Sequence, residues 1–185
     1  EGIDGVYFDD DTFIIEKQRV KDICSEIVKR RLKITWRCMA RVNNIDYETL
    51  IAMKKAGCTD VFYGFESGSE RILKDVNKGI TKEQILRVNQ KLAHHRDLIP
   101  HYNFIYGTPG ETYEDLLETK DVVLQLLSDN PKAYFGFGSD WKPIPGSKML
   151  EVAETQYDFA APKTLDDWIQ IDSSDAKTKI VHSWY

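Results

Sequence analysis

The stretch that decides the fold spans residues 61–69 and reads Val-Phe-Tyr-Gly-Phe-Glu-Ser-Gly-Ser. Residues 60–65 are rich in aromatic and branched side chains, which is typical of a buried strand. A lone carboxylate, Glu66, follows the strand, and residues 67–69 turn the chain toward a helix. Carboxylates are rarely buried without a partner, and α/β folds bind ligands where parallel strands end. The stretch therefore predicts a ligand site centred on Glu66.

Strand-like and helix-like segments alternate on both sides of this stretch. The predicted strands are 5–8, 34–40, 60–65, 102–106 and 133–137. Strict alternation of five such units predicts parallel strands with right-handed crossovers. A closed eightfold barrel needs about 250 residues, and the chain has 185. We therefore expect an α/β fold, a partial TIM-type (β/α) barrel over residues 1–157, followed by a C-terminal strap or tail over 158–185. A doubly wound sheet is the competing fold, but it usually carries a GxGxxG loop that this sequence lacks.

Helix starts are signalled by short polar side chains. Asp46 can cap one helix, and residues 81–84 form a capping box for another. Thr112 caps a long helix to about residue 127. The predicted apolar face of that helix consists of Leu116, Leu117, Val123, Leu124 and Leu127.

Composition limits the classes of partner. The net charge is −5, which gives no basic field for nucleic acid. No apolar run approaches the roughly 20 residues that span a bilayer. The three cysteines, Cys24, Cys38 and Cys58, match no metal-binding spacing and suit a reducing compartment. We expect a cytoplasmic protein that binds neither nucleic acid nor membrane, with cysteines that act as small buried apolar residues.

Polar residues and glycines follow the predicted strands. They are the Asp run 9–11, Arg41, Glu66 with Ser67, and the loop 107–111. Arg41 could bind a carboxylate through two hydrogen bonds, and Glu66 could accept hydrogen bonds from hydroxyl or ammonium groups. The glycines would let the main chain approach a flat ring. These groups predict one binding rim at the carboxyl ends of the strands.

Each of these features also has a purely structural interpretation. The Asp run can be a solvated turn, and the loop 107–111 can simply begin a helix. Arg41 can pair with Asp10 or Glu66. The aromatic residues of the strands are mostly expected in the core. An aldolase-type enzyme would need a Lys at a strand end for a Schiff base, and no predicted strand end offers one.

Seven short segments, in order, resemble the radical S-adenosylmethionine (SAM) enzymes. They are residues 8–13, 36–41, 53–58, 64–69, 78–81, 104–112 and 143–147. The resemblance covers about residues 5–150 and is strongest to the branch often fused to a cobalamin-binding domain. That branch includes the anaerobic magnesium-protoporphyrin ester cyclase and many Fe–S oxidoreductases.

This resemblance implies about five parallel strands of a (β/α)6 barrel that holds SAM at its carboxyl mouth. A [4Fe–4S] cluster splits SAM there, and the 5′-deoxyadenosyl radical takes hydrogen from a small-molecule substrate. By resemblance, Glu66 and Ser67 would contact the ribose and methionine part, and Arg41 would lie near the carboxylate. Ile105 and Gly107 would bound the adenine. The residues that shape the loop or close the site would be Pro109, Gly110, Asp10 and Asp11.

One departure from the family pattern concerns the cluster. The family holds it with a Cys-x3-Cys-x2-Cys loop, which this sequence lacks, and Fe–S clusters require thiolate ligands. The chain therefore resembles strands two to six of the barrel, cut from a longer protein, and we assign it no catalytic or metal-binding residue. We expect the chain alone to be inactive and to need the missing N-terminal part, with cobalamin on another domain as a further candidate cofactor. An exposed edge strand could form a homodimer. The alternative is a non-catalytic barrel half that binds a metabolite or a partner chain.

Overall fold

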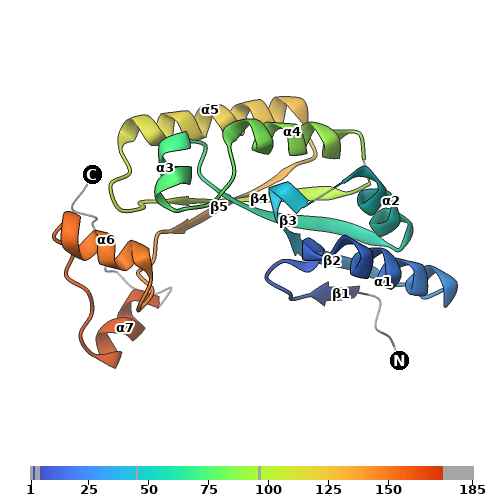
Figure 1. The fold of residues 1–185 in the computed structure, drawn as a ribbon, viewed down its shortest axis with the longest axis horizontal. Helices are drawn as coiled ribbons and strands as arrows, with labels where there is room; N and C mark the ends of the chain where they lie inside the picture. Colours follow the sequence, from blue (N-terminus) through green and yellow to red (C-terminus); the bar gives the residue numbers. More distant parts are fainter. Residues whose placement is uncertain (1, 3–4, 45, 96, 173–185) are drawn as a thin grey trace.

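The computed structural model describes residues 2, 5–44, 46–95 and 97–172, and its centre is a parallel five-stranded sheet (Figure 1). The strand order is β1-β2-β3-β4-β5, so each strand pairs with its neighbours in sequence. The strands are β1 (Gly5–Phe8), β2 (Thr35–Ala40), β3 (Cys58–Glu66), β4 (Ile99–Tyr106) and β5 (Tyr134–Asp140). The predicted α/β fold with five parallel strands is confirmed.

Helices connect the strands and begin at local capping signals. They are α1 (Lys17–Lys29), α2 (Tyr47–Lys55), α3 (Glu70–Asp75), α4 (Lys82–Ala93), α5 (Tyr113–Asp129), α6 (Lys148–Gln156) and α7 (Leu165–Asp172), with short 3₁₀ turns at Phe13–Ile15 and Val42–Asn44. Asp46 accepts a hydrogen bond from the Thr49 N–H. Thr81 and Thr112 both form capping boxes. The predicted caps are confirmed because each depends only on residues one turn away.

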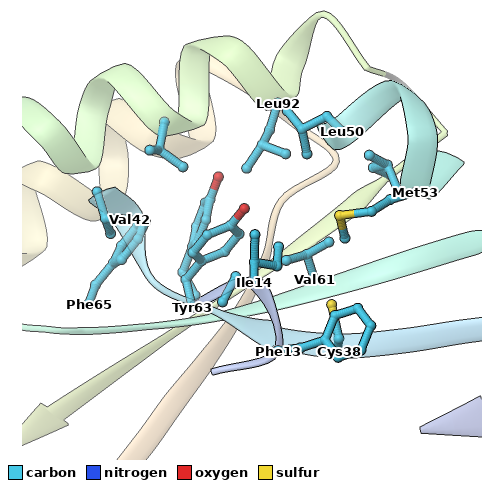
Figure 2. Packing of buried hydrophobic residues seen from close by; sticks show 14 of the residues in the cluster. Phe13, Ile14, Cys38, Val42, Leu50, Met53, Val61, Tyr63, Phe65 and Leu92 are labelled. Carbon is cyan, nitrogen blue, oxygen red and sulfur yellow. The ribbon is translucent and has the colours of Figure 1, made fainter. Parts of the chain in front are cut away.

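The core lies between the sheet and the helices α1, α2, α4 and α5. Val61 and Tyr63 are fully buried and point from β3 toward Leu50 of α2 and Leu92 of α4 (Figure 2). The hydroxyl of Tyr102 in β4 donates to Asn89 of α4. Alternate residues of a strand point to opposite faces of the sheet, so Phe62 and His101 belong to the other face.

Several predicted strand boundaries and one predicted helix face were wrong, and β5 ends three residues after its predicted end. β4 begins three residues before its predicted start, because Pro100, which cannot donate a ladder hydrogen bond, made that segment look unlike a strand. The buried apolar residues of α5 are Val122, Val123 and Leu126, whereas Leu124 is 57% exposed. Apolar residues surround this helix on several sides, and the sequence alone could not tell which side meets the sheet.

The carboxyl-terminal region extends beyond β5 (Figure 1). Helix α7 lies inside the predicted tail, and Phe159 packs against Trp141 with 5.7 Å between ring centroids. The domain boundary at residue 157 stays a prediction, and residues 173–185 lie outside the described residues. None of the described helices combines the length and the apolarity that a bilayer crossing requires.

Candidate functional site

Three predicted site residues lie at the carboxyl edge of neighbouring strands. Arg41, which follows β2, donates to the main-chain carbonyl of Lys78 (3.2 Å). Lys78 in turn donates from Nζ to Glu66 Oε1 (2.5 Å). Glu66 is in register with Phe104 of β4, so Gly107 follows β4 at the same edge. Arg41, Glu66 and Gly107 therefore share one rim, and their role in binding a ligand stays a prediction.

Glu66 has an unusual main-chain conformation. Its φ is +67°, and the N–H of Ser67 donates to the carbonyl of Phe65 (2.9 Å), which closes a γ-turn around Glu66. A Cβ atom on Gly64 would collide with the Glu66 carboxylate, so this glycine leaves the space that the Glu66–Lys78 pair occupies. Non-glycine residues with positive φ are strained by about 1–3 kcal/mol and are frequent at functional sites. The geometry thus singles out Glu66, as the sequence did.

The side chain of Ser67, unlike that of Glu66, is hydrogen-bonded to α5. The Ser67 side chain is fully buried, with Oγ 3.1 Å from Thr119 Oγ1 of α5. Ser67 Oγ also accepts from the Ser69 N–H, and Thr119 Oγ1 accepts from the Gly68 N–H. Contact between a ligand and the Ser67 hydroxyl would require breaking these bonds, and the Ser67 N–H is also engaged, by the carbonyl of Phe65.

A buried carboxylate, Asp115 at the start of α5, links the loops after β3 and β4. It accepts from Ser69 Oγ (2.6 Å) and from the guanidinium of Arg71. Arg71 also donates to the carbonyl of Gly110 (2.8 Å). Burial alone would raise the pKa of Asp115, but the bonds from Arg71, Ser69 and Thr112 hold that pKa well below its usual range. The contacts of Asp115 with Ser69 and Arg71 were not predicted from the sequence, although the spacing of Thr112 and Asp115 is that of a capping box.

The loop 107–111 is anchored rather than a simple turn before a helix. Gly107 has φ +74°, and its N–H donates to Glu111 Oε2 (2.5 Å). The loop residues are buried, including Pro109 and Gly110. Among the described residues, Thr108 Oγ1 is buried without a hydrogen-bond partner. Just before the loop, Ile105 lines an apolar groove of about 440 Å³ between β4 and α5.

The loop after β1 carries the two remaining predicted residues. Asp10 pairs with Arg19 of α1 (3.0 Å), and both side chains are 41% exposed. Asp11 is also exposed. Within the described residues no hydrogen bond or ion pair joins Asp10 or Asp11 to Arg41 or Glu66. This loop has the character of a solvated turn.

The cysteines do not fit a [4Fe–4S] cluster. Cys24, Cys38 and Cys58 are free and buried, as predicted for small apolar residues. Burial raises the pKa of Cys24 to about 11 and that of Cys58 well above its usual value, with the Cys38 thiol adding to both shifts. Thiolates, the form that binds iron, are therefore disfavoured. Within the part of the chain that the structure describes, no three His, Cys, Asp or Glu side chains are grouped to hold a metal ion.

Comparisons with known proteins place these features in a family context. The family model described as the radical SAM superfamily matches residues 2–123. An uncharacterised methyltransferase of Pyrococcus horikoshii is 37% identical over 152 residues, which is 82% of this chain and 32% of the relative. The anaerobic magnesium-protoporphyrin IX monomethyl ester cyclase of Rubrivivax gelatinosus is 35% identical over 107 residues, which is 57% of this chain and 19% of the cyclase.

A solved structure shares the fold. The radical SAM methyltransferase TsrM from Kitasatospora setae, with cobalamin and a [4Fe–4S] cluster bound, superposes with a TM-score of 0.68 at 22% identity, over 81% of this chain and 28% of TsrM. This likeness confirms the predicted partial-barrel fold. The chain spans less than a third of the length of these relatives.

Proposed function

Because this chain belongs to the radical SAM superfamily, we propose that it forms the SAM-binding part of an enzyme that transfers a methyl group. The observation that carries this proposal is the 37% identity to the Pyrococcus methyltransferase over 82% of the chain. TsrM, the structural relative, is also a methyltransferase. A cyclase acting on a tetrapyrrole is the second candidate, because the Rubrivivax cyclase is 35% identical over 107 residues.

The rim residues have the chemistry that the two ends of SAM require. In this proposal the Arg41 guanidinium binds the SAM carboxylate, and Glu66 accepts from the ammonium group or the ribose hydroxyls. The contact with Lys78 supports the assignment of Glu66, because the Lys78 ammonium group already lies 2.5 Å from Glu66 Oε1 and a SAM ammonium group has the same chemistry. Binding would replace one ammonium partner of Glu66 with another, so the carboxylate never loses its countercharge.

The loop after β4 would contact the adenine end of SAM. Gly107 and Gly110 have φ of +74° and +78°, a conformation that glycine adopts readily, and Gly107 has no side chain that would block the approach of a flat ring. Ile105 supplies an apolar side chain, and Pro109 fixes the path of the loop. Asp10 and Asp11 stay proposed as closing residues on the β1 side.

The family's [4Fe–4S] cluster would supply the electron for the chemistry on SAM. The buried thiols described above do not fit this cluster. We therefore place its ligands, and a cobalamin site, in parts of the protein outside these 185 residues. The residues of this chain bind and orient SAM and exclude water from it.

The alternative is a non-catalytic barrel half that binds a metabolite or a partner chain. The two proposals are separated with the full-length protein, produced anaerobically with iron and sulfide. We expect cluster absorbance and SAM-derived 5′-deoxyadenosine. A preparation that shows neither the cluster absorbance nor 5′-deoxyadenosine would favour the alternative. A homodimer through edge strand β1 also stays a proposal, to be tested by sedimentation.

The SAM site itself is tested by equilibrium binding. Glu66→Gln keeps the size of the side chain and removes its charge, so we expect SAM affinity to fall about tenfold, the usual scale for a lost charged hydrogen bond. Glu48→Gln is the matched control, because Glu48 is an exposed residue of α2 that pairs with Lys21 of α1. Equal affinity of the Glu66→Gln variant and the unmodified protein would remove Glu66 from the site.

A further inference from the structure

The face of the sheet opposite the core carries a row of flat side chains. It runs across all five strands and consists of Tyr7, Arg37, Phe62, His101 and Tyr134, called the row below. Their neighbours in sequence, such as Val6, Trp36 and Val61, belong to or pack on the core. The alternation of side chains along a strand therefore places the row on the face away from α2, α4 and α5.

Contacts along the row are continuous. The Arg37 guanidinium lies 4.9 Å from the centroid of the Tyr7 ring and 5.8 Å from that of Phe62. Phe62 stacks on His101 at 4.2 Å, and His101 lies 5.0 Å from Tyr134. His101 Nε2 is 2.6 Å from Asp60 Oδ1, which fixes the imidazole. The row is a pre-formed surface of flat groups rather than a set of independent side chains.

Arg37 has no anionic partner in the described chain. It is exposed, and no ion pair joins it to any described carboxylate, whereas Asp60 on the neighbouring strand pairs with His101. A guanidinium that lies on aromatic rings keeps the edges of its plane for hydrogen bonds. Such an arrangement is suited to a carboxylate or another flat anion.

A cavity adjoins this end of the row. Its volume is about 380 Å³, and Tyr7, Arg37 and Asp60 line it. Tyr7 is 41% exposed, so its ring is accessible from the cavity side. The volume lies within the usual range for small-molecule sites. Phe62 lies four residues before Glu66 on β3, about 13 Å along a strand, which separates this cavity from the rim.

We propose that this cavity binds a planar aromatic molecule that carries a carboxylate or another anionic group. The ring of the ligand packs on Tyr7, and its anionic group accepts hydrogen bonds from the edge of the Arg37 guanidinium. Phe62, which is itself stacked on His101, also contacts the guanidinium. This proposal does not rest on the function proposed above, because none of its residues belongs to the rim.

The test uses two probes of the same shape, 2-naphthoate and the uncharged 2-naphthamide, titrated into the full-length protein by calorimetry. We expect naphthoate to bind about tenfold more tightly than naphthamide. Arg37→Gln should abolish this preference by weakening naphthoate alone, and Tyr7→Ala should weaken both probes several-fold. SAM affinity, measured in parallel, should not change in either variant.

Two controls match the variants in residue type. Tyr134→Ala changes the exposed tyrosine at the far end of the row, three strands from Arg37, and Arg87→Gln changes an exposed arginine on α4. Neither should affect either probe. Thermal melting confirms that each variant is folded. If Arg37→Gln does not fold, Arg37→Lys, which keeps the charge, replaces it. Absence of binding, or equal binding of both probes by the unmodified protein, would overturn the proposal.

Discussion

The two sides of the rim at the carboxyl ends of the strands are built in different ways. On the β1 side, Asp10 and Asp11 are exposed, and Asp10 is held by one surface ion pair with Arg19. On the β3–β4 side, Ser67, Ser69 and Asp115 are buried and connected to one another or to α5. Surface ion pairs contribute little, whereas buried hydrogen-bonded carboxylates are costly to disturb.

This difference indicates which side of the rim can hold a ligand in one fixed orientation. Groups that orient a ligand must themselves be fixed by packing and by further hydrogen bonds. Glu66 and Gly110 meet this condition through the loops that Asp115 joins, and Asp10 does not. The β3–β4 side is therefore the rigid part of the rim, and the β1 side can adjust to it.

The largest effect is expected when the link between the two rigid loops is removed. Asp115→Asn keeps the volume but loses the charge that accepts from Arg71 and Ser69, so we expect the free energy of unfolding to fall by about 3 kcal/mol. For a protein of this size that corresponds to a fall in Tm of about 6–12 °C. Asp10→Asn on the other side should cost less than about 0.5 kcal/mol. Equal effects in the two variants, measured by thermal melting, would show that the two sides do not differ.

Acid should reveal the same asymmetry. The pKa of Asp115 is lowered in the folded protein, so its contribution to stability is complete above the unfolded pKa of about 3.9 and is lost as the pH falls below it. Asp46 contributes in the same direction, because its bonds with Thr49 and Lys17 outweigh burial and lower its pKa to about 2. Stability measured from pH 6 to pH 2.5 should decline less steeply in Asp115→Asn than in the unmodified protein. An unchanged slope would contradict the role given to Asp115.

A smaller effect is expected from a pair of glycines with the same backbone conformation. Gly79 and Gly110 have φ of +69° and +78°, but a Cβ atom on Gly79 meets open space, whereas one on Gly110 meets the ring of Tyr157. Gly79→Ala should cost about 1 kcal/mol for the conformation alone, and Gly110→Ala about 2 kcal/mol. Denaturant unfolding measures the difference. A larger cost at Gly79 would indicate that the loop after β4 is the looser of the two.

Local signals made most of the fold predictable. Caps such as Asp46 and Thr112 act over three residues, and the apolar run around Val61 is a strand in any parallel sheet. The prediction of a site at Glu66 also used a local signal, namely a carboxylate directly after a buried strand. By contrast, Thr119 contacts Ser67 although the two are 52 residues apart in the sequence, and no local sequence pattern near either residue predicts this contact. The position of Lys78 over Gly64 likewise depends on the three-dimensional path of the chain.

The strand order has a consequence for how the protein is made. Since each strand pairs with the one before it, a growing chain can add β2 to β1 and β3 to β2 without waiting for distant segments. The turn around Glu66 is different, because Thr119 and Asp115 leave the ribosome about 50 residues later. The sheet can therefore assemble in the order of translation, while the loop around Glu66 becomes rigid only after α5 has been synthesised.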